Sequence, residues 1–188
     1  VEYVQAGGGL WHKASLKGRQ RDATGFQLWL SLPPELEEAP ARSVYVPPEA
    51  VAQKDNVRVL LGEYEGARSP IVAPYPINYF WVQLAEGQTF SFLPPADHEI
   101  CWAFAFGGRV TSSGLSTSEE LLIFDREEGA LSFVAETAAQ LMVATSPVHP
   151  HPLAIGWSSV HTSSEILRRC EARISEMGRE LRLAGRIL

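Results

Sequence analysis

The chain has 188 residues, of which 45% are apolar and 20% are charged, as in an ordinary globular protein. Its 16 basic and 22 acidic residues give a net charge of −6, which argues against direct nucleic-acid binding because phosphate contacts need a basic face. The longest apolar runs are far shorter than a membrane span and no signal-peptide pattern is visible, so we expect no membrane association.

The first 15 residues, VEYVQAGGGLWHKAS, place three consecutive glycines before a Trp–His pair. Glycines tolerate positive φ and let other backbone or a ligand approach closely, but neither of the usual glycine-rich phosphate-loop patterns is present. His12 is either a ligand to a metal or a substrate, or a polar group at the end of a strand. The residues leave both interpretations open.

Residues 33–56 contain five of the 13 prolines and few residues that look buried. Proline fixes φ and removes a hydrogen-bond donor from a strand, so this segment is predicted to be a connector with short extended pieces. It separates residues 1–32 from the rest of the chain.

Beyond residue 56, short runs of aromatic and β-branched residues alternate with turn residues. Such runs at roughly ten-residue spacing predict an all-β fold, an antiparallel sandwich or barrel. The predicted strands are 57–61, 79–84, 89–93, 99–106, 120–124, 131–134 and 140–145.

The strand predicted at 99–106 has one bulky and one small face. The bulky face consists of Ile100, Trp102, Phe104 and Phe106, and the small face of Cys101, Ala103 and Ala105. We expect close packing against the small face because protein interiors rarely leave voids. The alternative, a pocket for a small apolar molecule, stays open.

Three further histidines are considered. His149 and His151 could hold a metal if they lay on a strand, but no third ligand is evident and the neighbouring prolines favour a rigid surface loop. His98 is interpreted as a polar residue at the start of a strand.

A helix is predicted near the C-terminus, beginning with a capping box of Thr162 and Glu165. Its apolar residues recur at helical spacing and form one stripe, which we expect to dock on a sheet. Gly178 is expected to end or kink this helix. The stripe consists of Ile166, Cys170, Ile174, Met177 and Leu181.

Residues 165–188 carry six arginines and four glutamates, which leaves a net charge of −8 on the preceding 164 residues. The helix could therefore meet an acidic surface of its own protein or of a partner, or could simply present a solvated face. Cys101 and Cys170 match no metal spacing and are predicted to be reduced core residues of a cytoplasmic protein, or a nuclear one if the source is eukaryotic.

The sequence resembles the pirins, a branch of the cupin superfamily. VEYVQAGGGLWHKA is similar to the pirin segment Q-W-M-T-A-G-x-G-I-x-H-x-E, and GFQLWLSLPPELEEAPARSVYV to the stretch that closes the first cupin domain. VRVLLGEYEGARSPI resembles the start of the second domain, and FLPPADHEICWAFAFGG its central hairpin. HPLAIGWSSVHTSSEI resembles the segment before the last helix of the family.

The resemblance implies two stacked jelly-roll barrels. In pirins the N-terminal barrel holds one metal, usually taken as iron, through two histidines of an H-P-H-R-G motif and the His and Glu of the H-x-E. Here His12 occupies the position of that last histidine, while Ala14 occupies the carboxylate position and cannot ligate. The H-P-H-R-G motif is absent, and the HPHP at 149–152 lies in the wrong context to replace it.

A jelly-roll barrel needs roughly 80–100 residues, so residues 1–32, with about three strands, form only the end of a first barrel. The expected organisation is an incomplete N-terminal cupin barrel (1–32), a Pro-rich linker (33–56), a C-terminal cupin barrel (57–164) and a C-terminal amphipathic helix and tail (165–188).

Two functions follow from the resemblance. The first is a non-catalytic binding or regulatory protein with a degenerate metal site, whose partner is another protein or a second copy bound through exposed strand edges and the C-terminal helix. The second is a flavonol (quercetin) 2,3-dioxygenase-like enzyme with iron or another divalent transition metal, in which His12 is one ligand and the others lie upstream.

Overall fold

The structure is a computed structural model that describes residues 1–12, 25–125 and 129–187. Contacts divide the chain into two compact units. Unit 1 comprises Val1–Tyr3 and Val44–Val148, and unit 2 comprises Val4–Ser43 and His149–Leu188. The C-terminal segment thus belongs to the same unit as residues 4–43. The four predicted domain boundaries stay predictions.

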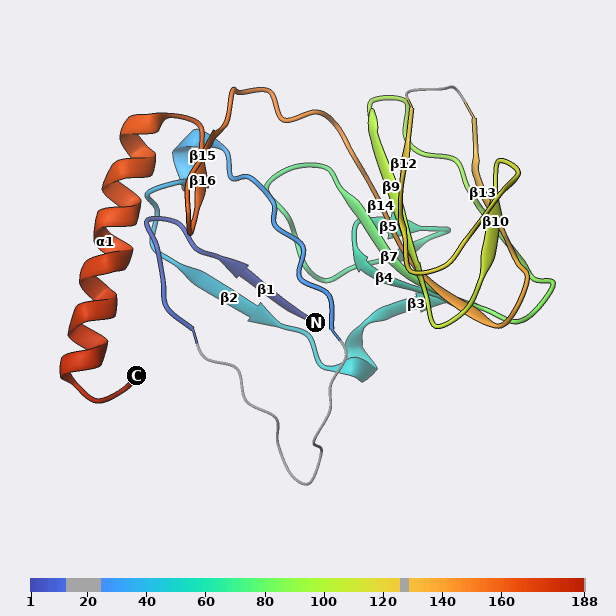
Figure 1. Cartoon of the computed structure of the whole chain (residues 1–188), viewed down its shortest axis with the longest axis horizontal. Coiled ribbons are helices and arrows are strands. Elements are labelled where there is room, and N and C mark those ends of the chain that lie inside the picture. Colours follow the sequence, from blue (N-terminus) through green and yellow to red (C-terminus); the bar gives the residue numbers. More distant parts are fainter. Residues whose placement is uncertain (13–24, 126–128, 188) are drawn as a thin grey trace. The chain divides into compact units, whose positions relative to one another are not determined.

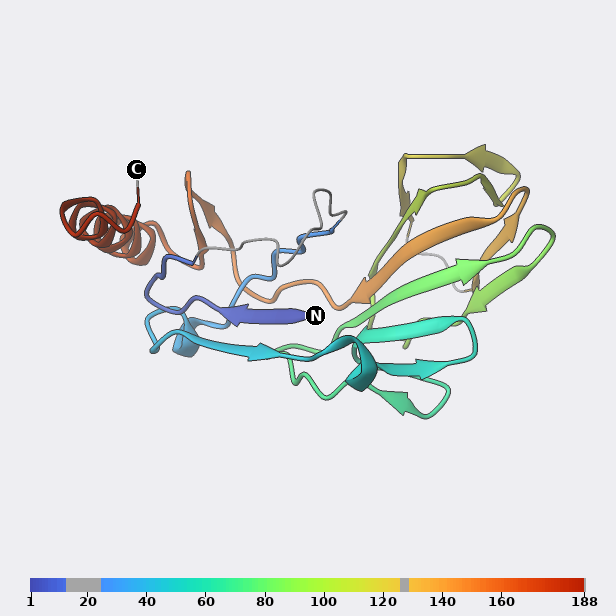
Figure 2. The same ribbon diagram turned by 90° about the horizontal axis from the view of Figure 1, so that it is seen from below.

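Unit 1 is built from two antiparallel sheets and a small hairpin, as Figures 1 and 2 show. The six-stranded sheet has the order β12-β9-β14-β7-β4-β3 and the four-stranded sheet the order β11-β10-β13-β8, while β5 pairs with β6. The bounds of the six-stranded sheet, in chain order, are Ala52–Lys54 (β3), Val57–Leu61 (β4), Asn78–Leu84 (β7), Ile100–Phe106 (β9), Leu121–Phe124 (β12) and Ala139–Ser146 (β14). Those of the four-stranded sheet are Thr89–Phe92 (β8), Val110–Ser112 (β10), Leu115–Thr117 (β11) and Leu131–Ala135 (β13), and the hairpin consists of Glu63–Tyr64 (β5) and Ala67–Arg68 (β6).

All seven strands predicted beyond residue 56 are confirmed, with ends that differ by at most a residue or so. The shorter strands β3, β5, β6, β10 and β11, which have two or three residues each, were not predicted. Strands this short give too few alternating positions for a pattern to be recognised. The predicted all-β jelly-roll fold is confirmed.

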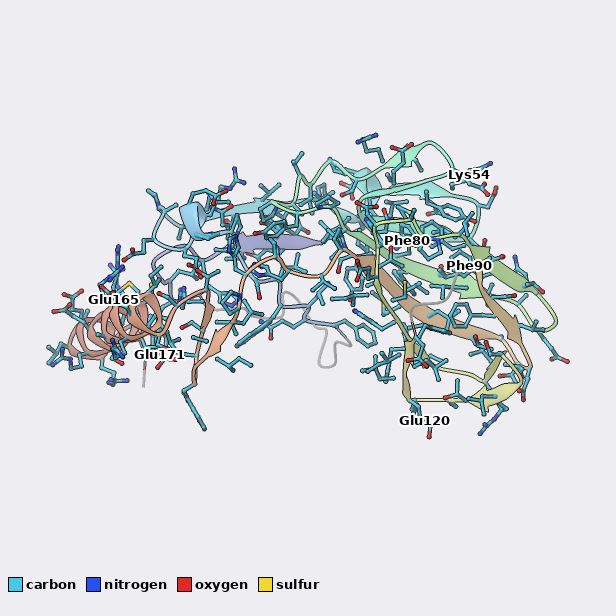
Figure 3. All side chains as sticks on the ribbon, turned by 90° about the horizontal axis from the view of Figure 1, so that it is seen from above. Lys54, Phe80, Phe90, Glu120, Glu165 and Glu171 are labelled. Atoms are coloured by element: carbon cyan, nitrogen blue, oxygen red, sulfur yellow. The ribbon has the colours of Figure 1, made fainter. Side chains whose placement is uncertain are left out.

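The core of unit 1 lies between its two sheets. Phe80 of β7 and Phe133 of β13 are fully buried, and Phe90 of β8 is almost so; Figure 3 shows Phe80 and Phe90 within the strands of unit 1. The small face of β9 points into this core, where Ala103 and Ala105 are completely buried among the rings. Small side chains on one strand thus make room for large ones on its neighbours.

Unit 2 contains the C-terminal helix α1 (Ser164–Leu183) and the hairpin of β15 (Ala154–Ile155) with β16 (Val160–His161). The hairpin lies beside α1 (Figure 1). Ile174 and Met177 of the apolar stripe instead lie next to Gly9 of the N-terminal segment, so the stripe does not dock on a sheet alone. The short helices η1 (Pro34–Leu36) and η2 (Pro48–Ala50) each begin at a proline, which suits a first helical turn because its missing N–H needs no partner.

The described part of residues 1–32 contains one regular strand. Strand β1 (Glu2–Gln5) pairs with β2 (Arg42–Tyr45). Of about three strands expected in residues 1–32, β1 is the one found in the described part of that range, and residues 25–32 have no regular structure.

The predicted capping box of α1 is wrong, and so is the predicted end of the helix at Gly178. The N-cap is Ser163, whose hydroxyl accepts a hydrogen bond from the amide of Ile166 at 3.2 Å. Thr162 instead donates to the Glu37 carboxylate, and Glu165 pairs with Arg169. Gly178 does not end the helix, which continues to Leu183. No described helix is long and apolar enough to cross a bilayer.

The glycines of the opening stretch allow close backbone approach. Gly7 has φ of +54°, and a Cβ there would lie 1.9 Å from the carbonyl oxygen of Ala39. Gly9 has φ of +109°, and its Cβ would lie 2.7 Å from the Ile174 side chain of α1. The prediction that these glycines admit other backbone is confirmed at Gly7.

Replacing Gly7 by alanine is therefore expected to destabilise unit 2 by about 2 kcal/mol or more, since positive φ and a backbone clash add together. Gly87→Ala is the matched control, because Gly87 also has positive φ (+75°) but no atom within 4 Å of a Cβ. Urea unfolding followed by circular dichroism measures both variants. Equal losses for the two would show that the close approach to Ala39 contributes nothing.

Candidate functional site

His12, the predicted metal ligand, has an exposed side chain. Its neighbour Trp11 donates an indole hydrogen bond to the backbone oxygen of Ile174 at 2.8 Å, so the backbone just before His12 is attached to α1. Ala14, at the carboxylate position of the pirin motif, lies outside the described residues. The structure thus places His12 at the surface of unit 2, where a metal could reach it.

The described residues do not provide the rest of a metal site. In residues 1–12, 25–125 and 129–187, no group of three or more His, Cys, Asp or Glu side chains is arranged to hold a metal ion. Alanine has no donor atom with which to complete the set at position 14. These described residues do not fit the metal that the family resemblance implies.

His149 and His151 lie in a loop, as the prolines predicted. The ring nitrogens of His149 lie within hydrogen-bonding distance of two backbone oxygens, at 3.1 Å from His151 and 3.3 Å from Leu32. The two imidazole rings are 5.7 Å apart, centroid to centroid. The structure therefore gives His149 a role in holding the loop to residue 32.

A cluster of hydrogen-bonded polar side chains in unit 1 is centred on His98. The sequence pattern predicted this histidine to be a polar residue at the start of a strand. His98 is only 8% exposed, and its Nδ1 lies 2.8 Å from the hydroxyl of Thr145 on β14. Asn78 of β7 donates to the same hydroxyl at 3.3 Å, and its side-chain oxygen accepts the amide of Glu63 at 3.2 Å. These residues, from four separate segments, form a continuous network whose members His98, Asn78 and Thr145 are buried.

Burial keeps the imidazole of His98 neutral. It lowers the pKa of His98, because the charged form is poorly solvated there. Nδ1 lies 2.8 Å from the Thr145 hydroxyl, which can either donate to it or accept from it. The site then holds a neutral histidine, oriented by hydrogen bonds.

An open pocket of about 480 Å³ lies beside this network. The segment 71–77, with the sequence IVAPYPI, supplies one wall and carries mainly apolar side chains. The remaining lining residues are Gly62, Glu63, Arg68, Ser69, Asn78, Pro95 and His98. A pocket of this size with a few fixed polar groups has the general character of a small-molecule site.

A second buried cluster lies in unit 2 and connects the linker to α1. Glu37 is 1% exposed, and its carboxylate accepts hydrogen bonds from the amide of Thr162 at 2.5 Å and from its hydroxyl at 2.7 Å. His161, 4% exposed, has Nδ1 3.4 Å from the same carboxylate. Next to it, exposed Glu38 pairs with Arg169, whose hydrogen bond lowers the pKa of that carboxyl. This cluster fastens the connector to the start of the helix.

Both buried clusters were missed because they join residues that are distant in the sequence. His98 and Thr145 are 47 residues apart, and Glu37 and Thr162 are 125 apart. A single glutamate in a Pro-rich connector gives no sign of burial, since glutamate is usually exposed. The predicted burial of Cys101 and Cys170 is confirmed, and both thiols are free.

Comparison with known proteins gives consistent results. The chain is 26% identical over 181 residues to a pirin-like protein of Caulobacter vibrioides, covering 92% of this chain and 62% of that protein. It is 25% identical over 183 residues to a candidate quercetin 2,3-dioxygenase of Pseudomonas aeruginosa, covering 88% and 63%. The chain therefore spans about three fifths of the length of the curated relatives it matches. No protein-family model matches it.

Solved structures support the fold. A crystal structure of quercetin 2,3-dioxygenase from Acinetobacter baumannii superposes with a TM-score of 0.68 at 19% identity, covering 79% of this chain and 53% of that one. A Geobacillus kaustophilus structure gives a TM-score of 0.55 at 15% identity, covering 63% and 53%. With the pirin motifs read from the sequence, these likenesses support the resemblance: the chain is similar in sequence to a pirin-like protein and has the jelly-roll fold of the solved structures.

Proposed function

We propose that this chain acts as a pirin-like binding or regulatory protein and performs no metal-centred catalysis with its own residues. The observation that supports this most directly is the ligand set. His12 keeps one ligand position of the family, Ala14 replaces the carboxylate, and the described residues offer no other group that could complete a site. A single imidazole holds a transition metal too weakly for a resident cofactor.

The alternative is a dioxygenase-like enzyme in which His12 joins ligands supplied by sequence upstream of this chain. Two observations favour it: His12 is exposed and so accessible to further ligands, and one relative is named for quercetin 2,3-dioxygenase activity. In that case a divalent metal, such as iron, would polarise the substrate and oxygen, and a carboxylate other than residue 14 would act as base.

Metal analysis separates the two functions. The purified chain, loaded with ferrous iron under anaerobic conditions and then dialysed, is expected to retain far less than one equivalent of metal. His12→Ala should retain the same small amount, and His151→Ala serves as the matched control on another exposed loop. Stoichiometric iron that disappears in His12→Ala alone would contradict the proposal.

Activity gives a second, independent readout. Quercetin consumption, followed by its visible absorbance with and without added ferrous iron, is expected to equal the rate without protein for both the wild type and His12→Ala. Metal-dependent turnover by the wild type that is lost in His12→Ala would instead support the dioxygenase.

We also propose that the partner is a protein or a second copy of the chain. The observation behind this is the exposed face of α1, which carries arginines and contrasts with the acidic remainder of the chain. Sedimentation velocity over a range of concentrations tests self-association, which salt should weaken if charge contributes.

A further inference from the structure

The solvent-facing side of α1 carries two arginines separated by small residues. Arg168, Ala172, Ser175 and Arg179 follow one another at intervals of four, three and four residues, so they share one face of the helix, which we call the outer helix face. All four are exposed, and they lie on the side of the helix away from buried Cys170. Within the described part of the chain, neither arginine forms an ion pair. The small residues between them allow another surface to approach the helix closely.

Strand β12 offers an exposed apolar surface at the edge of the six-stranded sheet. Leu122 and Phe124 pack against the core of unit 1, while Leu121 and Ile123 alternate with them and are 56% and 77% exposed. The strand pairs with β9 on one side, and no other strand of the described residues pairs with its second edge. Exposed apolar side chains on an open sheet edge are typical of an interaction surface.

Carboxylates lie at both ends of this strand. Glu120 precedes β12 and projects outward from unit 1 (Figure 3), and Asp125 follows the strand. Both are exposed, and neither forms an ion pair among the residues that the structure describes. We call Glu120, Leu121, Ile123 and Asp125 the β12 patch. It is apolar in the middle and acidic at each end.

The outer helix face and the β12 patch match in length as well as in charge. Arg168 and Arg179 are eleven residues apart, which is about 16 Å along a helix. Glu120 and Asp125 are five residues apart, which is about 17 Å along a strand. Both arginines can therefore meet a carboxylate at the same time, while the small residues of the outer helix face lie over the two apolar side chains of the β12 patch.

The charges of the two units favour a second copy of the chain as the occupant of the outer helix face. Unit 1 contains 5 basic and 14 acidic residues, a net charge of −9, and unit 2 contains 11 basic and 8 acidic residues, a net charge of +3. Unit 2 of one copy is thus attracted to unit 1 of another. Because the two surfaces differ, the contact is heterologous and can repeat from copy to copy.

We propose that the chain self-associates by docking the outer helix face of one copy on the β12 patch of a second copy. Arg168 and Arg179 pair with the carboxylates at the ends of the patch. The inference rests on the proposed function, in which the partner is a protein or a second copy, and it names the surface on that partner.

Reversing the charges on each surface tests the contact. The sedimentation coefficient of the wild type should rise between about 10 μM and about 1 mM, as for a small interface, and return to the monomer value in about 1 M sodium chloride, where the Debye length is about 3 Å. The helix variant Arg168→Glu/Arg179→Glu and the strand variant Glu120→Arg/Asp125→Arg should each weaken self-association at least about tenfold. An equimolar mixture of the two variants should associate again, because the reversed helix then meets the reversed strand.

Two further variants control for net charge and for the apolar contact. Glu49→Arg/Glu86→Arg changes the net charge as the strand variant does, at exposed positions of unit 1 outside the β12 patch, and should still self-associate. Ile123→Ala changes no charge and should weaken association about threefold to tenfold through lost apolar contact. Circular dichroism should show unchanged folding, since every substituted side chain is exposed.

The outcomes separate this inference from the proposed function. A wild type that stays monomeric over the whole concentration range, or a mixture of the two reversed variants that does not associate, would overturn the inference. Association that is lost in the helix variant but retained in the strand variant would also overturn it, since the helix would then bind a different acidic surface. The metal-retention and quercetin measurements on His12 are independent of all these results.

Discussion

Glu37→Ala is expected to destabilise the protein by roughly 2–5 kcal/mol, because it leaves two partly buried donors of Thr162 without an acceptor and removes the buried carboxylate beside His161. The loss should concentrate in unit 2, where this carboxylate joins the connector to the start of α1. Amide hydrogen exchange of Ser164–Leu183 should therefore become markedly faster in the variant.

The adjacent glutamate is a matched control for this experiment. Glu38 is exposed and its ion pair with Arg169 lies at the surface, so Glu38→Ala should shift the urea midpoint very little. Glu37→Gln should fall between the two, since an amide keeps the shape and one acceptor oxygen. If Glu37→Ala and Glu38→Ala had similar midpoints, the buried cluster would not be what fastens the helix.

Phe80→Ala is expected to cost about 3–5 kcal/mol, since it removes a fully buried ring from the middle of the core of unit 1. The ring makes edge-to-face contacts with Tyr64 and Phe92, with centroids 5.5 and 5.0 Å away. The sheets cannot close around the missing volume without disturbing the pairing of β7 with β14 and β4. Thermal unfolding monitored by near-ultraviolet circular dichroism should show the loss.

Ile123→Ala provides the comparison for Phe80→Ala. Ile123 lies on β12 of the same sheet but is 77% exposed, so its truncation should change stability by less than about 0.5 kcal/mol. A loss of the same size at both positions would mean that the core does not lie between the two sheets.

The strands and the buried face of the helix were predictable from the sequence, because they depend on local hydrophobic patterns. Alternation of aromatic and β-branched residues located all seven predicted strands, because each has enough positions for one face to differ from the other. The stripe from Ile166 to Leu181 identified the buried face of α1, and the motifs around His12 carried the resemblance to the pirins. The metal role of His12 and the domain boundaries stay predictions.

Which polar residues are buried and hydrogen-bonded depends on the tertiary structure. The N-cap of α1 is Ser163, one residue after the predicted Thr162, because the Thr162 hydroxyl binds the carboxylate of Glu37. A contact between residues 125 apart in the sequence thus outweighs the local capping pattern. His98 is buried and hydrogen-bonded because β7 and β14 bring Asn78 and Thr145 together and place the Thr145 hydroxyl beside its ring. Burial and hydrogen bonding of a polar group depend on residues from several strands at once, and no stretch of sequence records that arrangement.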